Sequence, residues 1–297
     1  MIKKALTPLI ILLSGVVVLS TAGPVIKLYT FQPMKLAFYR LFFGLIAFLV
    51  FFLLKREKSP YKMSRRDFLF FSLGGLFLAL HFFIWITSFS YTTVAGGVVP
   101  ILIQPILVSI LSWLFYREGL SLKLSIPLII SFSGITIMTW RDIIRDPVLG
   151  TGDLLAVLGI AMVSIYFLVA RKAVQKAGPI RFNIVTYSIA CLFLLVLLRV
   201  QDISLMIHNT RELVIILWLG IACSFFGYLS VNYALKTFTT PEVSIALIGE
   251  PVLSVVWAGL FLAEPVHLSQ QAGLYLGVLG LVLFVYIKSK DRKRVSK

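Results

Sequence analysis

Glu250 stands near the middle of an otherwise apolar stretch, residues 243–265, and Pro251 follows it directly. The stretch is long enough to cross a bilayer, where a carboxylate is costly and a proline interrupts helical hydrogen bonding. A carboxyl group isolated in such surroundings is expected to be largely neutral. Glu250 could therefore exchange a proton with each side in turn, or bind a substrate ammonium group. The alternative is structural: neutral Glu250 hydrogen-bonds a neighbouring helix.

Other polar and aromatic side chains also fall near the middle of long apolar stretches. Some are spaced for one helix face: His81 and Trp85 are four residues apart, as are Tyr228 and Asn232. The predicted substrate-binding residues are His81, Trp85, Gln104, Tyr166, Tyr228, Asn232 and Glu250, with Glu250 and His81 as candidates for proton coupling. The alternatives are a satisfied core histidine, plain aromatic packing, and interhelical hydrogen bonds from the amides.

Two prolines directly follow two of these polar positions. Pro105 follows Gln104 as Pro251 follows Glu250, and we expect both prolines to break their helices. The carbonyls of Ile101 and Leu247 are expected to lose their helical partners, about one turn from the polar side chain. Free carbonyls at membrane depth are tolerated where they line a wet cavity. The pattern predicts a small polar site at mid-membrane.

The composition supplies the elements that must hold this site. The 297 residues are 59% hydrophobic and 13% charged, against roughly 25% charged residues in soluble domains. This is typical of a polytopic, all-α membrane protein. The net charge of +16 does not indicate nucleic-acid binding, because the basic residues lie in short loops between apolar runs. Neither the two cysteines nor the three histidines form a metal-binding pattern, and we expect no cofactor.

Ten apolar segments are long enough to span a bilayer. They cover residues 5–28, 34–54, 68–91, 94–116, 122–140, 152–171, 181–200, 213–235, 242–262 and 269–287. With the N-terminus in the cytoplasm, 21 Lys and Arg residues lie on the inner side and 6 on the outer side. This asymmetry predicts a multi-pass protein of the inner (cytoplasmic) membrane with both termini in the cytoplasm.

The chain repeats itself weakly. At an offset of 146 residues, Gln104 aligns with Glu250 and Pro105 with Pro251, and Thr93 aligns with Thr239. The predicted repeats, residues 1–146 and 147–297, hold five segments each. Because five is odd, the second repeat must enter the membrane from the opposite side, which gives the inverted-repeat design of many secondary transporters.

The order and spacing of several motifs resemble the ten-helix, EamA-type branch of the drug/metabolite transporter superfamily. The motifs are "GPVIKLYTFQPMKLAFYRLFFG", "HFFIWITSFSYTTVA", "GDLLAVLGIAMVSIYFLVARKA" and "NYALKTFTTPEVSIALIGEPVLSVVWAGLFLAEPV". The resemblance implies a carrier of small organic metabolites or amino acids, usually an exporter. It also implies a central cavity lined by segments 1, 3, 4, 6, 8 and 9. One departure is "YRE" at the end of segment four, where the family more often has a small residue before the Glu.

The prediction is a non-enzymatic secondary transporter that works by alternating access and could be coupled to protons. A channel would need a continuous polar filter, and an intramembrane enzyme would need a catalytic constellation. A sensor built on a carrier fold is a third alternative. The expected partners are a small-molecule substrate and membrane lipid, with no nucleic acid. Gly273 and Gly277 form a GxxxG step, so the chain is expected to be a monomer or a weak homodimer.

Overall fold

The computed structural model describes residues 2–55, 61–117 and 149–263, with scattered residues between 123 and 137 and between 275 and 287. Every regular element in the described part of the chain is helical, which confirms the predicted all-α class. The elements are α1 (Ile2–Leu19), α2 (Ala22–Lys27), α3 (Pro33–Lys55), α4 (Arg65–Ser88), α5 (Val94–Val98), η1 (Val99–Ile103), α6 (Gln104–Tyr116), α8 (Leu149–Ala177), α9 (Pro179–Val200), α10 (Thr210–Leu217), η2 (Trp218–Gly227), α11 (Tyr228–Ala234), α12 (Thr240–Ala246) and α13 (Gly249–Leu262).

Eight spans in the described residues are long and apolar enough to cross a membrane, and they match eight of the ten predicted segments. They are Thr7–Lys27, Pro33–Lys55, Arg65–Ser88, Val94–Tyr116, Leu154–Ala177, Pro179–Val200, Thr210–Ala234 and Thr240–Leu262. The predicted segments 122–140 and 269–287 fall largely outside the described residues, as do Gly273 and Gly277.

The span Leu154–Ala177 extends beyond the end of its predicted segment, 152–171. Helix α8 continues past Arg171 to Ala177, and the chain then turns at Gly178, which has a φ of +81°, into Pro179 at the start of α9. Hydropathy marks the apolar layer of the membrane, but helical hydrogen bonds continue into the polar interface. At that level Lys176 forms an ion pair with Asp67, with Nζ 2.5 Å from Oδ1.

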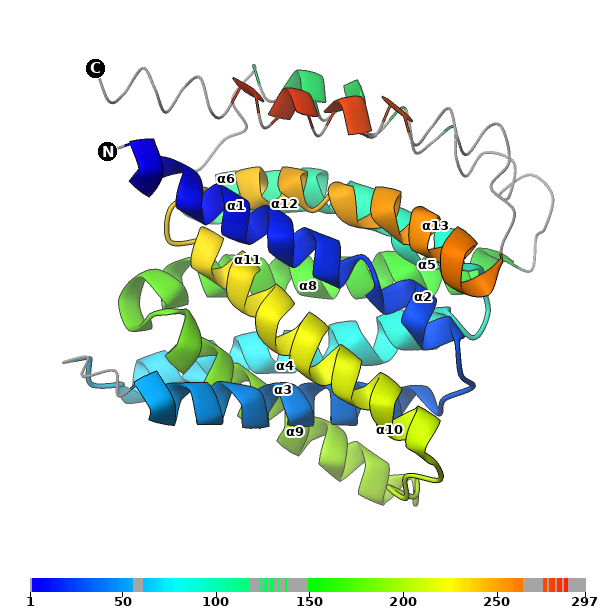
Figure 1. Ribbon diagram of the computed structural model, residues 1–297. Coiled ribbons are helices and arrows are strands. Elements are labelled where there is room, and N and C mark those ends of the chain that lie inside the picture. Colours follow the sequence, from blue (N-terminus) through cyan, green and yellow to red (C-terminus); the bar gives the residue numbers. More distant parts are fainter. Residues whose placement is uncertain are drawn as a thin grey trace.

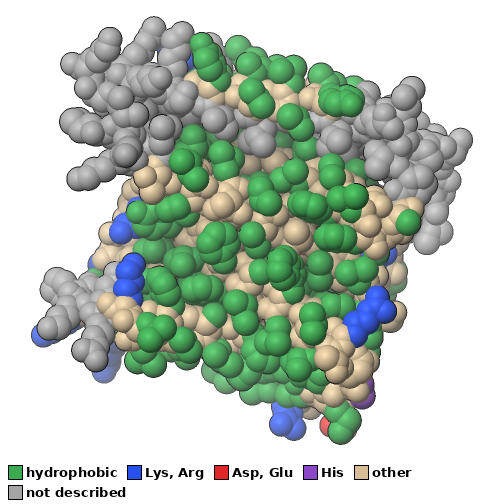
Figure 2. All heavy atoms as spheres, viewed as in Figure 1, with side chains coloured by type: hydrophobic (Ala, Val, Ile, Leu, Met, Phe, Trp, Pro, Cys, Tyr) green, Lys and Arg blue, Asp and Glu red, His purple; other side chains and the backbone are tan. Residues whose placement is uncertain are grey.

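Large apolar side chains cover the outside of the bundle. Leu53, Leu69 and Trp113 are 71%, 69% and 66% exposed, which would be unfavourable in water. Figure 2 shows apolar side chains spread over the visible face, with Lys and Arg near the edges of the view. This surface is suited to lipid, and the protein is a multi-pass membrane protein.

The two halves pack in a way that follows the repeat. In the repeat, α1 corresponds to α8, and α4 corresponds to the span of η2 and α11. Helix α4 packs on α8, and in the equivalent contact η2 and α11 pack on α1. Likewise, α3 corresponds to α9, and the contact of α4 with α9 is matched by the contact of η2 with α3. Corresponding spans also contact each other directly, α3 with α9 and α6 with α12. Corresponding spans run in opposite directions in Figure 1, as α3 and α9 show.

Glycines mark equivalent crossings in the two halves. A Cβ on Gly15 of α1 would lie 2.6 Å from Ser230 Cβ of α11, and a Cβ on Gly159 of α8 would lie 3.0 Å from Trp85 Cβ of α4. A Cβ at Gly15 would force its neighbours to move, and one at Gly159 would make a contact tighter than nearly all real Cβ contacts. Gly15 aligns with Gly159 at an offset of 144, so the weak repeat in the sequence corresponds to repeated helix packing.

Three of the eight spans are interrupted near their middle. The span Val94–Tyr116 passes from α5 through a 3₁₀ segment, η1, into α6, and the span Thr240–Leu262 breaks between α12 and α13. The span Thr210–Ala234 contains a π-helical stretch, η2, which the sequence analysis did not predict. Such π-helical turns are frequent at functional sites. All three interruptions lie next to the site described below.

Candidate functional site

A small cavity lies where the two halves meet. Its volume is about 40 Å³, enough for only a few water molecules. Its polar and aromatic wall consists of Arg40, His81, Phe82, Trp85, Gln104, Phe167, Tyr228 and Glu250. The rest of the wall is apolar and comes mainly from α1, η1 and α8. Five of the seven predicted substrate-binding residues therefore line one cavity, while Tyr166 and Asn232 lie elsewhere.

Gln104 and Glu250 stand at equivalent helix breaks on the cavity wall. Gln104 begins α6, and Glu250 is the second residue of α13. Gln104 is 3% exposed, whereas Glu250 keeps part of its surface open to the cavity. Neither side chain forms a hydrogen bond or ion pair with any described residue. An acid and an amide thus face the same small space without protein partners.

The carbonyls before the prolines are not free, and the expectation that they line the site unpaired was wrong. The backbone N–H of Gln104 donates to Ile101 O, and the N–H of Glu250 donates to Leu247 O at 2.9 Å. The chain tightens locally to bonds between residues three apart, which supplies the partner that proline removes. The helix breaks therefore orient Gln104 and Glu250 but do not contribute free acceptors.

His81 and Trp85 are held firmly in the wall by backbone carbonyls. His81 Nδ1 lies 2.8 Å from Gly159 O of α8, so Nδ1 carries the proton because a carbonyl only accepts. Trp85 Nε1 donates to Gly97 O of α5 at 2.8 Å. The two rings stack with centroids 5.8 Å apart. In this conformation the indole N–H is already used, and Trp85 presents mainly its ring to the cavity.

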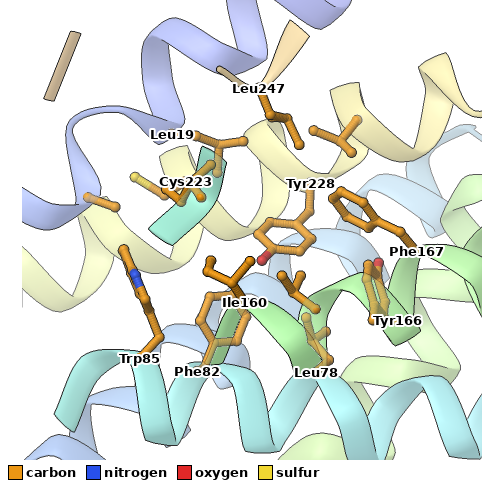
Figure 3. Packing of buried hydrophobic residues seen from close by; sticks show 14 of the residues in the cluster. Leu19, Leu78, Phe82, Trp85, Ile160, Tyr166, Phe167, Cys223, Tyr228 and Leu247 are labelled. Carbon is orange, nitrogen blue, oxygen red and sulfur yellow. The ribbon is translucent and has the colours of Figure 1, made fainter. Parts of the chain in front are cut away.

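Tyr228 occupies the centre of the aromatic cluster around the cavity. Its ring lies 5.4 Å from Phe82 and 5.9 Å from Tyr166, measured between centroids. Figure 3 shows the Tyr228 hydroxyl pointing toward Ile160, with Phe82 and Tyr166 on either side. The π-helical turn η2 ends just before Tyr228, and it sets which face of α11 is turned to the cavity.

Tyr166 and Asn232 meet in a separate buried cluster with Asn183. Asn232 Nδ2 donates to the Tyr166 hydroxyl at 2.6 Å and to Asn183 Oδ1 at 2.8 Å, and the Tyr166 hydroxyl lies 3.3 Å from the same oxygen. All three side chains are completely buried. The cluster joins α8, α9 and α11. Substrate contact by Tyr166 and Asn232 stays a prediction, and it would require this cluster to open.

Replacement of Asn183 by alanine tests whether this cluster stabilises the fold or contributes to substrate binding. The variant leaves Asn232 and Tyr166 without their shared acceptor, and we expect a loss of about 1 kcal/mol in stability. Thermal unfolding of the purified protein, compared with Leu192→Ala on the lipid-facing side of the same helix, measures this loss. A tenfold change in apparent KM with unchanged unfolding would contradict a purely structural cluster.

Asn183 and Arg40 are the site-forming residues that the sequence analysis underrated. The sequence analysis did not select Asn183, which lies in the first turns of α9, four residues after Pro179. From its position in the predicted segment 34–54, Arg40 could snorkel outward, pair within the bundle or contact substrate. It is 2% exposed, and its Nε donates to Ser224 Oγ at 2.9 Å. It therefore stays inside the bundle.

Comparison with known proteins agrees with this architecture. The EamA-like transporter family matches the chain twice, over residues 6–140 and 150–286. The chain belongs to the EamA-like transporter family. The two matches divide it close to the predicted boundary between repeats, and the family assignment makes it a transporter.

Relatives of this EamA-like transporter carry the same broad description. It is 26% identical over 276 residues to "Uncharacterized transporter YdfC" of Bacillus subtilis, a match that covers 89% of this chain and 85% of that protein. It is 28% identical over 196 residues to an "Uncharacterized transporter" of Archaeoglobus fulgidus, covering 65% and 68%. A crystal structure that shares 14% identity superposes with a TM-score of 0.75, covering 96% of this EamA-like chain and 99% of that one, and it supports the fold.

Proposed function

We propose that this EamA-like protein is a secondary transporter of small organic metabolites or amino acids that works by alternating access. The observation that carries the proposal is the small cavity between the two halves, which Glu250 lines without a hydrogen bond or ion pair to any described residue. A solute larger than a few water molecules can enter only if the halves move apart.

The opposite orientation of corresponding spans supports a mechanism in which the protein alternates between a conformation open to one side of the membrane and one open to the other. When two similar halves are inverted, a conformation open to one side implies a related conformation open to the other. The contacts that would rearrange are those across the cavity, where the broken spans α5–α6 and α12–α13 meet. Short interrupted helices can change their orientation without unwinding a complete span.

Glu250 is the proposed site of proton coupling. Glu250 stands near the middle of the span Thr240–Leu262 and lines the cavity between the halves, so its carboxyl group could be reached from each side in turn. His81 is the second candidate, since its ring also lines the cavity. Intramembrane acids commonly mark such pathways. Export, the inner membrane and cytoplasmic termini are proposed on the family resemblance and the distribution of basic residues.

Counterflow in liposomes tests the proposal. Purified protein is reconstituted into vesicles loaded with a panel of unlabelled amino acids and organic acids, and uptake of the matching radiolabelled solute is followed. A carrier gives transient, saturable accumulation of at least one solute that depends on the same solute inside. Conductance at channel rates, or chemical turnover without translocation, would contradict it.

A further inference from the structure

Arg40 carries a buried positive charge that the proposed mechanism does not use. The side chain reaches the cavity from α3, a span that the family resemblance did not place in the cavity wall. Its Nε is bound to Ser224, and its Cζ lies 4.3 Å from the centre of the Phe82 ring. Its Nη1 is buried and has no hydrogen-bond partner among the described residues.

A charge buried within a membrane span is costly, and the equivalent position in the other half carries none. The pattern of buried and exposed residues along α3 recurs along α9 at an offset of 146, which aligns Arg40 with Thr186. Thr186 is fully buried and donates to Phe182 O of its own helix at 3.0 Å. A small, internally satisfied side chain therefore fills the equivalent place in the other half. An unpaired guanidinium where a threonine suffices indicates a ligand.

The surroundings of Arg40 hold it ready for a planar anion. Ser224 fixes one edge of the guanidinium, and the face of Phe82 supports its plane. Preorganised in this way, the free N–H groups can bind a carboxylate with little loss of side-chain freedom. Arg40 is the one Lys or Arg side chain among the described residues that line the cavity. A single guanidinium suits a monovalent carboxylate better than a phosphate, which usually needs more donors.

We propose that Arg40 binds the carboxylate of the transported solute and sets the preference of the carrier for carboxylates over neutral analogues. The inference rests on the proposed function, because it places the solute in the cavity. Glu250 shares that cavity, so a deprotonated Glu250 competes for Arg40, and a protonated Glu250 leaves Arg40 to the solute.

Matched acid and amide pairs test the role of Arg40. Stabilisation of the full-length protein against heat is measured with alanine, leucine, isovalerate and succinate, and with the corresponding primary amides. At least one carboxylate is expected to stabilise the wild-type protein, with its amide roughly tenfold or more weaker. Arg40→Gln is expected to remove that difference, and Arg40→Lys to keep part of it. Arg211→Gln, on an exposed arginine of α10, is the control and should keep it in full.

A second measurement covers the case in which Arg40→Gln does not fold. Wild-type protein is treated with phenylglyoxal, and modification of the Arg40 peptide is followed by mass spectrometry. The stabilising carboxylate should slow modification of Arg40 but not of Arg211, and its amide should have no such effect.

Equal protection by acid and amide would overturn the inference, as would acid preference that survives in Arg40→Gln. If the protein performs counterflow but binds acids and amides equally well, the role of Arg40 is overturned and the proposed function stands. If it prefers acids in binding but translocates none of the solutes, the proposed function is overturned and the role of Arg40 in binding stands.

Discussion

Glu250→Gln is expected to abolish accumulation of solute driven by a pH gradient in proteoliposomes, while exchange of labelled for unlabelled solute continues. Glutamine has nearly the shape of a protonated glutamate and keeps its hydrogen-bonding groups, but it cannot carry a proton between the two sides. Accumulation should therefore fall to the level reached without a gradient. Counterflow should stay within a few-fold of wild type because the cavity keeps its shape.

A second acid in the same span provides the control. Glu242 lies at the start of α12, and its carboxylate accepts a hydrogen bond from Thr239 N at 3.0 Å, away from the cavity wall. Glu242→Gln should retain the pH-driven accumulation. If pH dependence survives intact in Glu250→Gln, protons are not coupled through Glu250, and His81 becomes the next residue to replace.

Lys35→Met is expected to cause the largest loss of stability among single substitutions in the described spans. Lys35 Nζ lies 2.7 Å from Glu212 Oε1, and the two side chains are only 7% and 2% exposed. Lys35 also donates to Met206 O, so it joins α3 to the chain before α10. Removing the lysine leaves a buried carboxylate without its counter-charge. Breaking such a pair from one side costs roughly 3–5 kcal/mol.

Thermal unfolding of purified variants measures this cost, and two further variants make the result specific. In Lys35→Met/Glu212→Gln no buried charge remains unpaired, so most of the lost stability should return. Lys176→Met removes the ion pair with Asp67 at the other end of the bundle, where the lysine side chain is 57% exposed. That change should cost no more than about 1 kcal/mol. Equal losses for Lys35→Met and Lys176→Met would show that burial does not decide the strength of these pairs.

The two ion pairs also show how far the repeat reaches. Asp67 and Glu212 are each the third residue of their helix, α4 and α10, and each N–H is capped by the side chain three residues earlier, Ser64 or Asn209. Their lysine partners are not equivalent, however, because Lys35 lies in the first turn of α3 whereas Lys176 lies near the end of α8. Local capping repeats in the sequence, but the choice of partner depends on which helix lies alongside.

The sequence by itself determined the class of this protein and the position of its central acid. Runs of about twenty apolar residues can satisfy their backbone in lipid only as helices, so eight spans could be located, and their ends lie within six residues of the predicted ones. The alignment of Gln104–Pro105 with Glu250–Pro251 could be seen in the sequence, and in the structure α6 begins at Gln104 and α13 at Gly249. Polar residues at mid-span also indicated the cavity, since Glu250, His81 and Tyr228 all line it.

Only the tertiary structure decided which polar residues meet. Helical periodicity shows which residues share a face, but it does not show which neighbouring helix covers that face. Tyr228 and Asn232 share one face of α11, yet Tyr228 faces the cavity and Asn232 bonds to Tyr166 and Asn183. The same reason explains Arg40, whose burial depends on Ser224 and Phe82 from two other spans. A long side chain can snorkel or turn inward, and the packing of neighbouring helices selects between the two.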